Sequence, residues 1–122
     1  MQYLLLIHDA ESVWETMPEQ ERNALYGEYM AYTNELRESG ALVGANQLQP
    51  TSTATTVRVR DGEQVVTDGP FAETKEQLGG YYLIEVESVD EALEWAAKIP
   101  SARYGTIEVR PVVPTRVEAS AG

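Results

Sequence analysis

The sequence contains no cysteine, one histidine and only two lysines, and each scarcity excludes a class of function. Without cysteine there are no disulfides, no thiolate nucleophile and no cysteine-ligated metal site. The sequence has two lysines and seven arginines but twenty acidic residues, which gives a formal net charge of −11. Because neutralising phosphates requires a basic face, this balance disfavours direct binding to nucleic acid and to anionic membranes. Only Arg58 and Arg60 lie close enough in sequence to form a small basic patch.

Long apolar runs are also missing. Leu4 to Ile7 is the longest run near the start, and it is too short for a signal-peptide core and lacks a basic flank. No run approaches the roughly 18 residues needed to span a bilayer. We therefore expect a cytoplasmic protein without membrane contact. The 122 residues, 43% of them hydrophobic, predict a single domain with one core.

Hydrophobic periodicity predicts two helices. The first covers residues 18–39, with Thr16 as the N-cap and Glu19 as its capping-box partner. Gly40 ends this helix in the left-handed conformation. A second capping box at Ser88 and Glu91 begins a helix that ends at Pro100. The apolar face of the first helix is formed by Leu25, Tyr29, Tyr32 and Leu36, and that of the second by Val89, Ala92, Leu93, Ala96 and Ile99.

Short apolar or alternating runs predict six strands. The pair 56–60 and 64–67 is joined by Asp61-Gly62, a strong signal for a tight hairpin. The others are expected at residues 2–7, 41–48, 81–86 and 105–110. The segment 71–78 fits neither period, although Phe71 is expected to anchor it in the core. Residues 1–113 form the predicted domain and residues 114–122 a polar C-terminal tail.

Without the hairpin, the order of elements is β-α-β-β-α-β, which predicts an α+β, ferredoxin-like antiparallel sheet with an inserted β-hairpin. Both helices should cover one face of the sheet. Strand alternation then leaves apolar side chains on the other face, among them Leu4 or Leu5 and Leu83 or Ile84. Because such a surface normally meets a partner, we expect a homodimer whose sheets pack face to face.

One stretch carries a family signal. Residues 68–76 read DGPFAETKE and are followed by GGYY at 79–82; DEA at 90–92, IEVRP at 107–111 and MQYLLLI at 1–7 extend the similarity. This pattern closely resembles the signature of the DGPF-domain proteins of the YCII-related family. The resemblance implies a dimeric α/β-barrel-type assembly of ferredoxin-like subunits. It also implies a small-molecule enzyme with a histidine–aspartate pair, although the first predicted helix lacks the histidine usual in that group.

The candidate site residues lie at a strand end and in the DGPF segment. His8 is the one imidazole and follows the first strand, so we predict acid/base catalysis by His8 with Asp68 as its orienting carboxylate. Asp68 equally fits a purely structural role in its turn. Ligand contacts are predicted from Glu73, Lys75, Glu76 and Tyr82. No metal or other cofactor is expected, because His8, Asp9 and Asp68 make a weak ligand set.

Two functions remain open from the sequence. In the first, a small metabolite is bound or transformed near His8 and the segment 68–76, by lyase-like or isomerase-like chemistry, since no redox-cofactor motif is present. In the second, the protein is a non-catalytic accessory or regulatory protein, associated with an alternative sigma factor pathway. The resemblance suggests the second function because DGPF proteins are often encoded beside such factors.

Overall fold

The computed structural model describes residues 1–114. Its central strand is β1 (Gln2–Asp9), on which the rest of the sheet is built. β1 pairs antiparallel with β5 (Gln77–Glu85) on one side and with β6 (Thr106–Pro111) on the other. β2 (Leu42–Gln47) pairs with the far edge of β5, so the strand order is β2-β5-β1-β6. This is the α+β, ferredoxin-like arrangement that the order of elements predicts.

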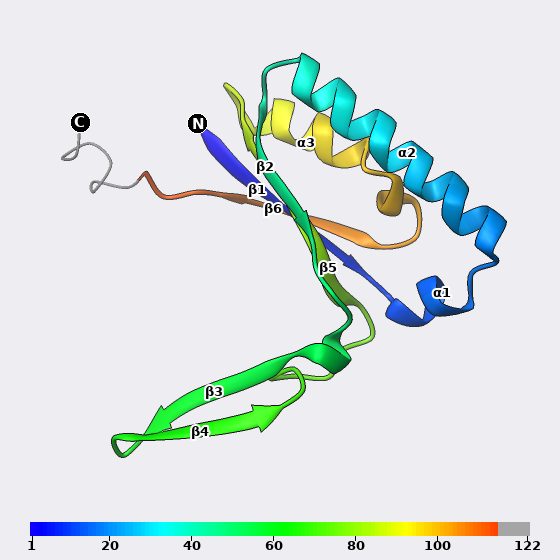
Figure 1. Cartoon of the computed structure of the whole chain (residues 1–122). Coiled ribbons are helices and arrows are strands. Elements are labelled where there is room, and N and C mark those ends of the chain that lie inside the picture. The colour runs from blue at the N-terminus through cyan, green and yellow to red at the C-terminus, as the bar shows by residue number, and fades with distance from the viewer. Residues whose placement is uncertain (115–122) are drawn as a thin grey trace.

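Three α-helices accompany the sheet. The long helix α2 (Glu19–Glu38) and the shorter α3 (Val89–Ala97) cover one of its faces, as Figure 1 shows. The short helix α1 (Glu11–Thr16) follows β1, and two 3₁₀ turns, η1 (Thr51–Thr53) and η2 (Pro100–Arg103), lie in the connections. No helix within residues 1–114 is both long enough and apolar enough to cross a membrane.

The core lies between the sheet and α2 and α3. Alternation along β1 places Tyr3, Leu5 and Ile7 in this core, where they meet Ile84 of β5 and Leu36 of α2. Burying each such side chain contributes about 1.5–3 kcal/mol to folding. Tyr32 adds an edge-to-face contact with Tyr82, with ring centroids 5.1 Å apart, and its hydroxyl donates to the carbonyl oxygen of Trp95 over 2.9 Å.

Within residues 1–114, no helix covers the other sheet face, which is called the open face below. Register places on it the side chains of Gln2, Leu4, Leu6 and His8 from β1, Tyr81, Leu83 and Glu85 from β5, and Thr106, Glu108 and Arg110 from β6. The apolar members Leu4, Leu6 and Leu83 remain partly exposed. The predicted uncovered apolar face is therefore present, at the centre of a surface with a polar margin.

The first predicted helix is confirmed to within one residue at each end, but its predicted cap is wrong. Pro18 holds the N-cap position of α2 without a side-chain hydrogen bond. The hydroxyl of Thr16 instead donates to the carbonyl oxygen of Ser12, over 2.7 Å, inside the unpredicted helix α1. Proline at Pro18 forces an extended backbone before it, so α1 and α2 are separate helices. Gly40 has the expected positive φ of 84°.

The second capping box is confirmed in one of its two bonds. The Glu91 amide donates to the Ser88 hydroxyl over 3.2 Å, whereas the Glu91 carboxylate accepts from the amide of Glu87 instead of that of Ser88. Two of the five predicted apolar positions are wrong, because Val89 and Leu93 are about half exposed, whereas Ala92, Ala96 and Ile99 are buried. Val89 and Leu93, four residues apart, lie together at one edge of the inward face of the helix.

The inserted hairpin of β3 (Thr55–Arg60) and β4 (Glu63–Asp68) is confirmed, and its turn has positive φ at Asp61 and Gly62. It forms a separate two-stranded sheet that projects from the body (Figure 1). The expectation that Phe71 is a core anchor is wrong, because its side chain is 80% exposed. The segment after the hairpin has no apolar surface of the body beside it that would bury this ring. Most of the predicted tail, 115–122, lies outside the described residues.

Two glycines, Gly80 and Gly105, lie too close to neighbouring backbone oxygens to accept a side chain, and the approach at Gly105 is the closer of the two. A Cβ at Gly105 would collide with the carbonyl oxygen of His8 and lie 2.9 Å from the Cβ of Asp9, whereas a Cβ at Gly27, inside α2, meets nothing within 4 Å. We expect Gly105→Ala to lower the free energy of unfolding by about 1–3 kcal/mol. Gly27→Ala should raise it by about 0.5–1 kcal/mol. Urea unfolding of both variants checks this, and equal stabilities would contradict it.

Candidate active site

A cavity of about 690 Å³ opens on the helix-covered side of the sheet, beyond the end of β1. α1, the first turns of α2, the end of β2 and the start of β5 enclose it. Its walls are largely aromatic, with Trp14, Tyr26 and Tyr29 on the helical side and Tyr82 on the sheet side. The rings of Trp14 and Tyr26 lie 5.3 Å apart, so α1 and α2 form one continuous wall.

Asp9 is the ionisable group at the floor of the cavity and is only 5% exposed. Its Oδ2 accepts a hydrogen bond from the indole Nε1 of Trp14 over 3.3 Å. Gly105 lies so close to Asp9 that a Cβ there would be 2.9 Å from the Asp9 Cβ, whereas a Cβ at Gly79 would meet Oδ1 of Asp9 at an ordinary contact distance of 3.4 Å. The sequence places an acid here because Asp9 continues the inward alternation of Tyr3, Leu5 and Ile7.

Burial raises the pKa of Asp9, because the surroundings solvate a carboxylate less well than water does. Hydrogen bonds from Trp14 and Ser101 oppose the rise, and the negative charges of Glu76 and Glu11 add to it. A carboxyl group whose pKa is moved toward neutrality inside a cavity is suited to donate and accept protons. Raised pKa values and concave surroundings occur together at functional sites more often than elsewhere.

A chain of hydroxyl groups extends from Asp9 into the protein. Ser101 is completely buried in η2, where its hydroxyl lowers the pKa of Asp9 and is hydrogen-bonded to the phenol of Tyr29. Burial raises the pKa of Tyr29 to about 12, so this phenol stays protonated and serves as a hydrogen-bond donor. Arg103 holds η2 against α2 through two 2.8 Å bonds to the carboxylate of Glu28, which fixes the position of Ser101.

Five hydrogen bonds fix the rim. Glu11 accepts from both the amide and the hydroxyl of Thr51, over 2.7 and 2.9 Å, and its own amide donates to Oε1 of Gln77 over 2.9 Å. Nη2 of Arg22 donates to the carbonyl oxygens of Trp14 and Met17. These bonds attach α1 to the body, because α1 itself buries no residue. The shape of the cavity therefore depends on polar contacts at its edge.

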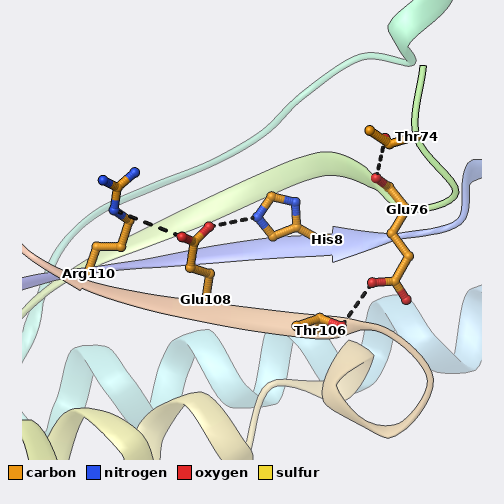
Figure 2. A network of polar contacts seen from close by, with 6 residues as sticks. All are labelled: His8, Thr74, Glu76, Thr106, Glu108 and Arg110. Atoms are coloured by element: carbon orange, nitrogen blue, oxygen red, sulfur yellow. Dashed lines mark hydrogen bonds and ion pairs between the residues drawn. The ribbon is translucent and has the colours of Figure 1, made fainter. Parts of the chain in front are cut away.

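His8 lies on the open face, on the opposite side of the sheet from Asp9. Its Nε2 is 3.2 Å from Oε1 of Glu108, and the Nε of Arg110 is 3.9 Å from the other oxygen of that carboxylate (Figure 2). Asp68 is exposed at the end of β4, and within residues 1–114 no hydrogen bond or ion pair joins it to His8. The carboxylate that the fold gives His8 is Glu108, so a His8–Asp68 pair stays a prediction.

The predicted ligand contacts lie in different places. Glu73 and Lys75 are exposed, while Glu76 reaches the sheet, where its carboxylate accepts from the hydroxyl of Thr106 over 2.9 Å (Figure 2). Tyr82 lines the cavity, and its hydroxyl is 2.7 Å from that of Thr33. None of His8, Asp68, Glu73, Lys75 and Glu76 lines the cavity. No group of three potential metal ligands occurs among the residues described.

The fold and the cavity define a small α+β protein with a buried carboxyl group in an aromatic pocket. The YCII-related domain model matches residues 1–116, so the chain belongs to the YCII-related family. An uncharacterized protein of Rhizobium meliloti (strain 1021), R00369, is 41% identical over 114 residues, which are 92% of each chain.

A solved structure is similar in fold. It is 5-chloro-2-hydroxyhydroquinone dehydrochlorinase (TftG) from Burkholderia phenoliruptrix AC1100, in complex with 2,5-dihydroxybenzoquinone. The similarity covers 96% of this chain and 98% of that chain, with a TM-score of 0.57 and 17% identity. At this identity the likeness concerns the fold alone.

The raised pKa of Asp9 gives a prediction about stability. The folded protein holds its proton above the unfolded pKa of 3.8, so this contribution to stability is complete below that pH and is lost as the pH rises through the folded pKa. Asp9→Asn removes the titration. The stability of the variant relative to the wild type should therefore increase from about pH 4 to about pH 7. Urea unfolding across this range measures it.

Glu94→Gln, an exposed site on α3, is the control and should show no such trend. A relative stability of Asp9→Asn that falls as the pH rises would mean that the ionised carboxylate is stabilised by its neighbours. In that case Asp9 would be a structural anchor and not a proton-exchanging group.

Proposed function

We propose that this protein transforms a small molecule in the cavity above Asp9, by proton transfer to and from that carboxyl group. The observation that carries the proposal is the buried Asp9 carboxyl at the floor of a cavity of about 690 Å³. Acid/base catalysis needs a group that exchanges protons readily and lies within reach of the substrate. The hydroxyl of Ser101 favours the ionised form of Asp9, and Ser101 is itself hydrogen-bonded to the phenol of Tyr29.

The lining favours an uncharged, flat and hydroxylated substrate. Asp9, Glu11 and Glu15 oppose the single cation Arg22 in the lining, so an anionic ligand would be repelled. Arg22 also uses one of its nitrogens on two carbonyl oxygens of the chain. The rings of Trp14, Tyr26 and Tyr29 offer flat apolar surface, against which a ring-shaped substrate packs well.

A lyase-like or isomerase-like reaction fits this site. Asp9 would take a proton from a ring hydroxyl and return it to a ring carbon, which becomes tetrahedral while the oxygen becomes a carbonyl. The ring would then either expel a leaving group from that carbon as its anion, with the proton of a second hydroxyl passing to Asp9, or be released as the isomerised keto form. The dehydrochlorination performed by the similar structure is a reaction of the first kind. The alternative of a non-catalytic accessory or regulatory protein stays a prediction, and it gains support if no ligand binds.

The test compares the two possible catalytic centres. Neutral hydroxylated rings, with 5-chloro-2-hydroxyhydroquinone among them, are incubated with the wild type, Asp9→Asn and His8→Gln, and turnover is followed by absorbance and chloride release. We expect Asp9→Asn to lose at least about 100-fold in kcat, as for loss of a general acid or base, and His8→Gln to stay within about threefold of the wild type. The reverse result would move the centre to His8 and Glu108.

Binding is measured separately by fluorescence. Trp14 lines the cavity, whereas Trp95 packs against Tyr32 and the core. A ligand in the cavity should quench the wild type and Trp95→Phe alike, and should leave Trp14→Phe unquenched. Equal quenching of both variants would place the ligand elsewhere. This readout needs no turnover, so it keeps binding distinct from catalysis.

We also infer that two copies of the chain pair through their open faces. Leu4, Leu6 and Leu83 are partly exposed in the middle of a surface that no helix covers. Unpartnered apolar patches of this kind normally meet a partner, and a second copy offers the same patch in a two-fold arrangement.

Sedimentation of a charged variant tests the pairing. We expect the wild type to be a dimer and Leu83→Lys a monomer at the same concentration, because a buried unpaired charge is costly. Leu93→Lys is the control, since Leu93 is half exposed on α3 in the helical layer. A monomeric wild type, or a dimeric Leu83→Lys, would contradict the pairing.

A further inference from the structure

The hairpin of residues 55–68, called the arm below, receives almost no burial from its own chain. Every side chain of β4 and the last four of β3 are exposed. Six residues per strand give the arm a reach of about 20 Å. A lone two-stranded hairpin is marginally stable in water and needs a third element to pack upon. The arm has a regular ladder, and no third strand pairs with it in the part of the chain that the structure describes.

One face of the arm is apolar. Val57 pairs directly with Val66, and Val59 lies two residues along on the same side; these three side chains, called the valine stripe below, are 56%, 61% and 61% exposed. The opposite face carries Arg58 and Arg60 together with Val65. Phe71, which follows the arm, is 80% exposed. Solvent-exposed valines on one strand face and an exposed phenylalanine nearby mark an interaction surface.

The direction of the arm indicates which partner it meets. Figure 1 shows the arm projecting from one end of the sheet, to the side away from α2 and α3. The open face looks to that same side. A second copy that packs on the open face therefore lies within reach of the arm.

The size of the open face gives a second argument. It offers four side chains from β1, three each from β5 and β6, and Asn46 from β2. A stable interface uses about 20–30 residues a side. The open face alone is thus small for a stable dimer, and the arm supplies the kind of additional apolar surface that a stable dimer needs.

We propose that the arm clasps a second copy of this chain, with the valine stripe and Phe71 against the partner. The two arms of a dimer make the same contact reciprocally, as two-fold symmetry requires. The clasp rests on the pairing of open faces proposed above and adds the segment that makes this pairing tight. It is independent of the chemistry at Asp9.

Adjacent residues of β4 provide a matched test. Val66 belongs to the valine stripe and Val65 to the opposite face, so the same substitution at each changes charge and size equally. We expect Val66→Lys to raise the dimer dissociation constant at least tenfold in analytical ultracentrifugation, and Val65→Lys to change it less than threefold. Equal effects, or no effect of either, would overturn the proposal.

Hydrogen exchange distinguishes the clasp from the pairing of open faces. Amides of residues 55–68 are compared in the wild-type dimer, in Val66→Lys and in the Leu83→Lys monomer. If the arm is held by the partner, exchange in the arm is at least tenfold faster in both variants than in the wild type. If Leu83→Lys dissociates the dimer while exchange in the arm is unchanged, the open faces pair and the clasp is wrong. If the wild type is monomeric, both the pairing and the clasp are wrong, and activity at Asp9 is still measured on its own.

Discussion

The alternation of β1 is the constraint on which the rest of this structure depends. β1 is hydrogen-bonded on both sides, so its residues cannot rotate to exchange faces without breaking two ladders. Neighbouring polar residues at its end are therefore sent to opposite sides of the sheet. His8 joins Glu108 and Arg110 on the open face, and Asp9 enters the cavity under the helices. Two candidate centres arise from two adjacent residues, and only one of them is enclosed.

Enclosure of Asp9 is energetically unfavourable, and the fold compensates for part of the cost. An ionised carboxylate removed from water is destabilising unless donors surround it. Trp14 and Ser101 supply two donors, while Glu11 and Glu76 work against ionisation. Gly79 and Gly105 allow close backbone approach at the same point. An apolar residue at position 9 would continue the buried pattern of Tyr3, Leu5 and Ile7. An acid at this position lowers the stability of the fold locally, as is expected of residues kept for function.

Features with a local physical cause could be predicted from the sequence. The Asp61-Gly62 turn, the positive φ of Gly40 and the long helix follow from backbone chemistry and periodicity, and each is present. Features that depend on tertiary contacts could not. Thr16 is a residue type that often caps helices, yet its hydroxyl donates to a carbonyl oxygen inside α1. Phe71 has the hydrophobicity of a core residue but no core beside it. Asp9 could have been identified as a candidate from the sequence, because an acid on the inward face of an apolar strand is unusual. Ser101 and Tyr29 could not, because they are brought next to Asp9 only by the tertiary fold.

Because the side chains of β1 alternate between the two faces of the sheet, the proposed catalytic cavity and the proposed dimer interface lie on different sides of the protein. The cavity lies among helices and strand ends, whereas the open face and the arm lie on the other side of the sheet. Most side chains belong to one of the two surfaces, but Tyr81 belongs to both, because it lies on the open face and also lines the cavity. The backbone of β1 is then the element that couples them, because any shift of its register would empty the cavity floor of Asp9 and bury His8 in its place.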